Sequence, residues 1–242
     1  MANTGGPKQL RRSLIAGAMR SIALFAAPVW VRALDTRSYC QGLEATFRKS
    51  VIRIISGFRT ISENAAFVIA GVPPFVEMAR KRAATYRQLR SRYHTVRNAG
   101  RQECLERWQR RWDRSPKGRW THRLILNIGE WNGRKHDQVN FHLTQVLSGH
   151  VCFRSYRFGH EASGDCSECG TLEDAEHTMF VCKLYGPLRN DLDRALGVPI
   201  AVGNLVSLML QSVDNWVVIC EFVSTVMQTQ RSMERARRES ME

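Results

Sequence analysis

The chain has 242 residues, 43% hydrophobic and 24% charged, a composition that excludes a disordered chain and allows one large domain or two smaller ones. Its formal net charge is +14 with a pI near 10.1, which indicates a polyanionic partner. Seven cysteines, an odd number, argue against a disulfide framework and favour a reducing intracellular compartment.

Helical periodicity dominates the first third of the chain. The apolar pattern of residues 10–34 predicts one long helix, kinked at Pro28 because proline cannot donate the helical hydrogen bond. Capping residues then predict a second helix over residues 35–55. Thr60 and Glu63 have the spacing of a capping box and predict a third, short helix.

The middle of the chain is strongly basic. Residues 76–135 carry 17 Lys and Arg against 5 Asp and Glu, interleaved with aromatic residues in a helical pattern. A basic helix is often only a solvated face, but so large an excess is costly without a counter-ion partner, and the pattern favours nucleic acid. The candidate contacts are Arg80, Lys81, Arg87, Arg90, Arg97, Arg110, Arg111, Lys117 and Arg119.

Two tryptophans in this basic segment have two interpretations. Trp108 and Trp112 are four residues apart and share one face of a predicted helix over residues 101–114. They could form a base-stacking platform, but tryptophans at this spacing are more often part of a core. We expect both side chains to be buried.

The strongest motif lies further on, with the pattern C-x2-C-x7-H-x4-C. Its members are Cys166, Cys169, His177 and Cys182, and Gly170 follows the second cysteine, where a knuckle needs positive φ. This spacing suits tetrahedral zinc, and both later ligands can reach the ion if the helix loosens near Cys182. Ordinary buried cysteines beside a surface histidine are the alternative. Four ligands leave no open position, so we expect a structural metal.

Acidic residues surround this motif. Residues 136–242 carry 9 Lys and Arg against 14 Asp and Glu, so the knuckle is poorly placed to hold phosphates by itself. A second metal site from His142, His150 and Cys152 is less favoured than structural histidines. Strand-like alternation is confined to residues 151–156, and helices are expected up to the C-terminus.

Several short phrases resemble one family. They are LFAAPVW at 24–30, AGVPP at 70–74, ERWQ at 106–109, GRWT at 118–121, HLTQVLSGH at 142–150, and Cys169-Gly170 followed by EDAEH at 173–177. They resemble the C-terminal part of the reverse-transcriptase polyprotein of non-LTR (LINE-type) retrotransposons of arthropods. The resemblance covers nearly the whole chain, and the CCHC spacing and the HLTQVLSGH phrase are its most specific parts.

The resemblance implies a mainly α architecture in four segments. These are a thumb-like helical region at 1–75, a basic helical linker at 76–135, a CCHC zinc-knuckle module at 136–200 and C-terminal helices at 201–242. It also implies that the four ligands named above hold a structural Zn²⁺, and that the chain binds RNA, DNA or both.

The same resemblance implies an enzyme only for the full-length element. Polymerisation needs paired aspartates that hold two metal ions, and the chain contains no Asp-Asp pair. We therefore expect a nucleic-acid-binding fragment without its own activity. The alternative is a protein-interaction or assembly module that docks on the polymerase part or another protein. We expect a location in the nucleus or cytoplasm and no membrane span, because no apolar run is long enough.

Overall fold

The computed structural model describes residues 9–90, 97–134, 138–150 and 164–239, without the side chains of 88–90, 97–99, 237 and 238. The chain forms two compact units, residues 1–133 and 134–242. The described residues form helices and contain no β-strand, only an isolated antiparallel bridge between Asp165 and Leu172. The predicted mainly α fold class is confirmed, and the predicted strand at 151–156 lies outside the described residues.

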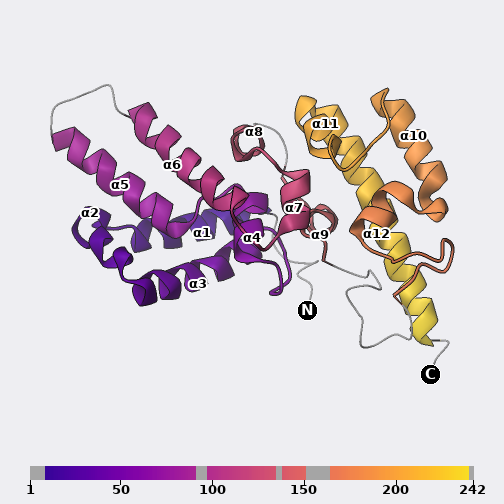
Figure 1. Ribbon diagram of the computed structural model, residues 1–242, viewed down its shortest axis with the longest axis horizontal. Helices are drawn as coiled ribbons and strands as arrows, with labels where there is room; N and C mark the ends of the chain where they lie inside the picture. Colours follow the sequence, from indigo (N-terminus) through magenta and orange to yellow (C-terminus); the bar gives the residue numbers. More distant parts are fainter. Residues whose placement is uncertain (1–8, 91–96, 135–137, 151–163, 240–242) are drawn as a thin grey trace. The chain divides into compact units, whose positions relative to one another are not determined.

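Unit 1 is a bundle of helices (Figure 1). Its long helices α5 and α6 lie side by side, and α2 and α3 pack against α5. The elements are α1 (Gln9–Ala23), α2 (Ala27–Trp30), the 3-10 helix η1 (Val31–Asp35), α3 (Arg37–Ile54), α4 (Glu63–Ala70), α5 (Phe75–Arg90), α6 (Arg97–Asp113), α7 (Arg119–Leu124) and α8 (Ile128–Gly133).

The first predicted helix is two helices. The break falls between Ala23 and Ala27, where Ala26 adopts a positive φ of 50°. Pro28 lies in the first turn of α2, a position that suits proline because the first N–H groups of a helix have no intrahelical partner. The chain therefore turns before the proline, and the predicted kink at Pro28 is wrong.

The predicted capping box is also wrong. α4 begins at Glu63 with Ser62 as its N-cap, so Thr60 lies outside the helix. Glu63 is thus the first helical residue, and its carboxylate accepts a hydrogen bond from Arg111 at 2.9 Å. At the other end, Gly71 adopts a φ of 65° and closes α4.

Tryptophans form much of the core of unit 1. Trp108 and Trp112 are each 1% exposed, which confirms the core interpretation. The Trp112 indole donates a hydrogen bond to the carbonyl of Ile125 at 2.9 Å, and the Trp131 indole donates to Ile69 at 3.3 Å. Each buried N–H thereby finds a partner.

Several apolar side chains of α1 are exposed among the described residues of unit 1. Leu14 and Ile22 are 75% and 76% exposed, and Leu10, Ile15 and Met19 are exposed as well. Apolar side chains gathered in this way are typical of an interaction surface. Among the described residues no single helix is long and apolar enough to cross a membrane, although the bent pair α1 and α2–η1 passes by length and composition alone.

Unit 2 is organised around the long helix α12 (Val213–Glu239), which packs against α9, α10 and α11. The buried side chains of α12 include Ile219, Val223 and Val226. The other elements are α9 (Phe141–Ser148), the π-helical turn η4 (His177–Val181), the 3-10 helix η5 (Lys183–Tyr185), α10 (Gly186–Leu196) and α11 (Leu205–Gln211).

Candidate functional site

The four predicted metal ligands of unit 2 come together. The ligand atoms of Cys166, Cys169, His177 and Cys182 all lie within 4.8 Å of one another. The sulfur of Cys182 is 3.8 Å from that of Cys166 and 4.0 Å from that of Cys169. A tetrahedral zinc with Zn–S bonds of about 2.3 Å would place its sulfurs about 3.8 Å apart. This cluster could therefore hold a metal ion.

A tight turn presents the first two cysteines. The N–H of Cys166 donates to the carbonyl of Thr171 at 2.7 Å, and the N–H of Gly170 donates to the carbonyl of Cys166 at 2.8 Å. Gly170 adopts a φ of 66°, as the sequence pattern predicted. The backbone N–H of Lys183 donates to the sulfur of Cys169 at 3.4 Å and lowers the pKa of that thiol.

A π-helical turn presents the other two ligands. The N–H of Cys182 donates to the carbonyl of His177, five residues earlier, at 2.7 Å. An α-helix places residues five apart about 500° around the axis, well away from a common face, so widening the turn brings both side chains to one point. The Asp174 carboxylate accepts from the N–H of His177 at 2.7 Å and fixes the start of the turn. The loosening expected near Cys182 is confirmed.

The histidine is oriented as a ligand. Its Nδ1 lies 3.2 Å from the hydroxyl oxygen of Thr171, whereas its Nε2 is buried and has no hydrogen-bond partner among the described residues. Metal-binding histidines commonly donate one ring N–H to such a partner, which leaves the other nitrogen for the ion. The unpartnered Nε2 of His177 fits that arrangement.

Contacts from two helices hold this centre in unit 2. The Gln230 side chain of α12 donates to the buried carboxylate of Glu173 at 2.6 Å. The Arg189 guanidinium of α10 donates to the carbonyl of Cys182 at 2.5 Å. Burial raises the pKa of the Cys182 thiol to about 12. Without a cation this thiol keeps its proton at neutral pH, and a bound ion would displace it.

The second metal site, which the sequence disfavours, gains no support from the described residues. His142 lies in α9, and His150 follows that helix, where its Nδ1 is 2.8 Å from the carbonyl of Ser148. Cys152 lies outside the described residues.

Unit 1 carries the predicted nucleic-acid contacts. Lys81 lines a groove of about 920 Å³ on one side of α5. Arg80 and Arg87 line a pocket of about 510 Å³ on another side of the same helix. The side chains of Arg90 and Arg97 lie outside the described residues.

Three further predicted contacts lie near the junction of α6 and α7. Arg110, Lys117 and Arg119 are all exposed. The Arg119 guanidinium donates to the carbonyls of Asp113 and Ser115 at 3.3 and 3.4 Å, so it also satisfies acceptors at the end of α6.

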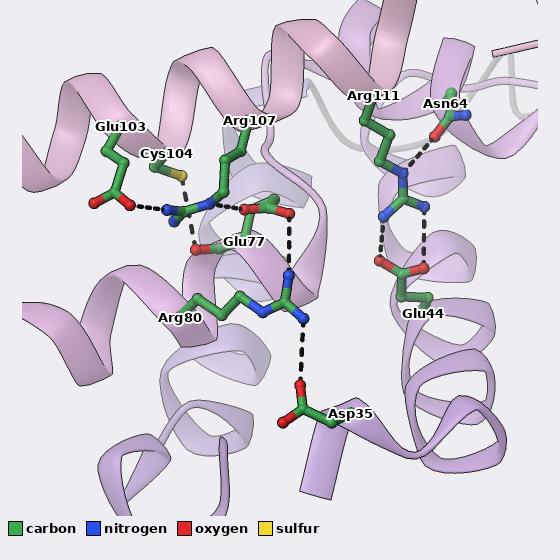
Figure 2. A network of polar contacts seen from close by, with 9 residues as sticks. All are labelled: Asp35, Glu44, Asn64, Glu77, Arg80, Glu103, Cys104, Arg107 and Arg111. Atoms are coloured by element: carbon green, nitrogen blue, oxygen red, sulfur yellow. Dashed lines mark hydrogen bonds and ion pairs between the residues drawn. The ribbon is translucent and has the colours of Figure 1, made fainter. Parts of the chain in front are cut away.

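The ninth predicted residue, Arg111, is engaged inside the protein. Its guanidinium donates to both carboxylate oxygens of Glu44 at 2.6 and 3.0 Å, and to Glu63 at 2.9 Å. Its Nε donates to the side chain of Asn64 at 3.1 Å, and Figure 2 shows the fork that it forms with Glu44. Although burial opposes it, the hydrogen bond with Glu44 raises the pKa of Arg111. The guanidinium of Arg111 is therefore engaged by these carboxylates and is not a candidate phosphate contact.

A second network joins α5 to α6 (Figure 2). The buried carboxylate of Glu77 accepts from Arg107 at 2.6 Å, and Arg107 also donates to Glu103 at 2.5 Å. Arg80 lies 4.0 Å from Glu77 and 3.5 Å from Asp35. Part of the charge of Arg80 is therefore balanced by these two carboxylates.

Two basic residues of the groove are missing from the sequence-derived set. Arg82 lines the groove beside Lys81, and its place in the basic run was a signal that could have included it. Arg20 lines the same groove from α1, and no local pattern connects it with α5.

Comparisons with known proteins give relatives of one kind. No family model matches the chain, and no solved structure matches it. Over 219 residues, which are 81% of this chain, it is 30% identical to a 115 kDa protein in type-1 retrotransposable element R1DM of Drosophila melanogaster. It is 27% identical over 234 residues, 87% of this chain, to a retrovirus-related Pol polyprotein from type-1 retrotransposable element R1 2 of Nasonia vitripennis.

The relatives are longer proteins. The chain spans 21% of the Drosophila relative and 56% of the Nasonia relative. A second Nasonia polyprotein, from element R1 4, is 22% identical over 227 residues. The chain is therefore related to the polyproteins of insect R1-type non-LTR retrotransposons, and the resemblance found in its sequence is confirmed.

Proposed function

We propose that this chain is a nucleic-acid-binding part of an R1-type retrotransposon polyprotein and corresponds to its C-terminal region. In this proposal unit 1 contacts RNA or DNA, and the Cys3His centre of unit 2 holds a structural Zn²⁺. The chain binds nucleic acid on behalf of the element's reverse transcriptase, in the nucleus or cytoplasm. It has no polymerase activity of its own.

One observation carries the proposal: α5 presents basic residues that the fold does not neutralise. Lys81, Arg82 and Arg87 make no ion pair with any other described side chain, whereas Arg107 and Arg111 are engaged by carboxylates. Excess cations of this kind bind phosphates and release the counter-ions around them. The relatives, which are named as proteins of type-1 retrotransposable elements, support the same conclusion.

The donor set supports zinc. Three thiolates and one imidazole suit Zn²⁺ better than Mg²⁺ or Ca²⁺, which prefer oxygen ligands. Cys166, Cys169, Cys182 and the unpartnered Nε2 of His177 complete four positions, so the ion would fix the fold of unit 2. With three thiolates the centre would be anionic, which leaves phosphate binding to unit 1.

A salt titration tests the binding proposal. The chain would be titrated with a labelled duplex DNA between 50 and 200 mM salt (about the range over which phosphate binding changes most). The test variant replaces Lys81, Arg82 and Arg87 with alanine. Each lost phosphate contact lowers the salt slope by about 0.9, so we expect a loss of about 2 to 3 units.

A matched control separates local contacts from overall charge. Replacement of the exposed Arg37, Arg53 and Arg59 with alanine removes the same charge from unit 1 without changing α5. We expect this variant to keep most of the slope. Equal slopes for the two triple variants would show that α5 is not the contact surface. Absence of binding by the unaltered chain to both this duplex and a single-stranded RNA would overturn the proposed function.

The exposed face of α1 favours a second candidate function. Leu14 and Ile22 offer an apolar surface on which the polymerase part of the element, or another protein, could dock. Co-purification of the chain with the polymerase part, repeated after nuclease treatment, tests this function. Retention after nuclease supports it, and loss shows that nucleic acid bridges the two.

A further inference from the structure

The groove on α5 combines two kinds of side chain. It holds about 920 Å³ between the turn that joins α1 to α2 and one side of α5. Two aromatic residues, Phe25 and Tyr86, line it and are 76% and 49% exposed. Arg20, Lys81 and Arg82 line it as well, and no acidic residue is found among the described residues that line it.

The turn that carries Phe25 is anchored to the rest of the unit. The Trp30 indole donates a hydrogen bond to the carbonyl of Phe25 at 2.8 Å. The Trp30 ring stacks on Phe75, the first residue of α5, with ring centroids 6.0 Å apart. The positive φ of Ala26 sets the direction of the chain at this point. Phe25 is thus exposed on a turn fixed against α5.

Exposed aromatic rings among cations suit an unpaired nucleic-acid strand. The planar faces of bases stack on aromatic side chains, and the phosphates between them pair with Lys and Arg. A duplex hides its base faces and could use only the cations. An apolar protein segment would use the rings but leave Arg20, Lys81 and Arg82 without anions. The single strand is the occupant that satisfies both sets.

We propose that this groove binds single-stranded nucleic acid, with bases stacked on Phe25 and Tyr86 and phosphates held by Arg20, Lys81 and Arg82. This inference rests on the proposed function and adds to it the form of nucleic acid and the residues that recognise its bases. The rings contribute only where a base is present, so they distinguish this groove from a purely ionic surface.

Binding of three probes by the full chain tests the inference. The probes are an oligothymidylate, an abasic oligomer with the same number of phosphates, and a duplex. The variants are Phe25→Ala and Tyr86→Ala, with Phe25→Trp and Tyr86→Phe as conservative partners. Tyr39→Ala is the matched control, because Tyr39 is an exposed aromatic residue of α3 outside the groove.

Each alanine variant should bind the oligothymidylate roughly 5- to 150-fold more weakly, the effect of one lost stack. Its salt slope and its affinity for the abasic oligomer and the duplex should not change. The conservative variants and Tyr39→Ala should bind all probes like the unaltered chain.

Three results would overturn the inference. Unchanged binding of oligothymidylate by both alanine variants would leave a protein segment as the occupant of the groove, while the proposed function would stand. Equal losses on the abasic oligomer would exclude base stacking. Absence of binding to every probe by the unaltered chain would overturn the proposed function as well.

Discussion

Replacement of Arg111 with leucine tests whether the ion network organises unit 1. Leucine keeps an apolar stem but removes the four hydrogen bonds that join α6 to Glu44, Glu63 and Asn64. Two carboxylates would then face each other without their shared cation. Removal of one partner from a fully buried ion pair costs about 3–5 kcal/mol. Because the Arg111 side chain is 30% exposed, we expect a smaller loss, about 2–4 kcal/mol.

The loss should depend on pH. Burial, with Glu44 adding to it, raises the pKa of Glu63 in the folded chain. A group whose folded pKa lies above its unfolded value stabilises the fold at low pH, and that contribution disappears as the pH rises through the folded pKa. Without Arg111 the pKa of Glu63 rises further. The deficit of the leucine variant should therefore be larger at pH 7 than near pH 5.

Urea unfolding followed by tryptophan fluorescence measures this deficit, since Trp108 and Trp112 report on unit 1. The matched control is Arg110→Leu, which makes the same change at an exposed neighbour on α6. A difference of less than about 0.5 kcal/mol between the two variants would refute the reasoning, because surface substitutions fall within that range.

Two further predictions concern unit 2 and a turn of unit 1. Cys182→Ser should abolish stoichiometric metal binding, whereas Cys220→Ser, which lies outside the centre, should not. Because the pKa of the Cys182 thiol is raised to about 12, the metal must displace its proton. The apparent affinity for the metal in a chelator competition should therefore rise at least about tenfold per pH unit between about pH 6 and 8, and a flat profile would contradict the assignment. Gly118→Ala should destabilise unit 1 by about 1–3 kcal/mol in urea unfolding, because Gly118 has a φ of +75° and a Cβ there would lie 2.7 Å from the Ser62 hydroxyl. The control is Gly133→Ala, whose added carbon would have nothing within 4 Å. Equal stabilities of the two variants would contradict the predicted backbone strain at Gly118.

The metal cluster could be predicted from sequence because its geometry is local. All four ligands lie between Cys166 and Cys182, and the turn at Gly170 and the spacing to His177 fix most of their positions. The π-helical turn could be anticipated for the same reason, because two ligands five residues apart cannot share a face of a regular α-helix. The short connections between these ligands allow few backbone conformations that bring all four side chains to one point.

Other parts of the fold depend on distant contacts and could not be predicted in this way. Arg111 and Glu44 are 67 residues apart, and nothing in the local pattern pairs them. The groove needs Arg20 and Lys81, which meet only because the chain turns at Ala26 and α2 packs on α5. The predicted kink at Pro28 failed because proline is as well suited to the start of a helix as to a break.

The basic composition of the chain therefore overstates its free charge. Arg107 and Arg111 lie in the most basic segment, yet both are held by buried or half-buried carboxylates that connect helices. Lys81 and Arg82 lie in the same segment and line an open groove. A cation already engaged by a carboxylate does not neutralise a phosphate and so releases no counter-ions from a nucleic acid. Of these four residues, we therefore expect only Lys81 and Arg82 to contribute to the salt dependence of the proposed binding. Counting charges locates a basic region, and the ion pairs decide which of its residues can act on a partner.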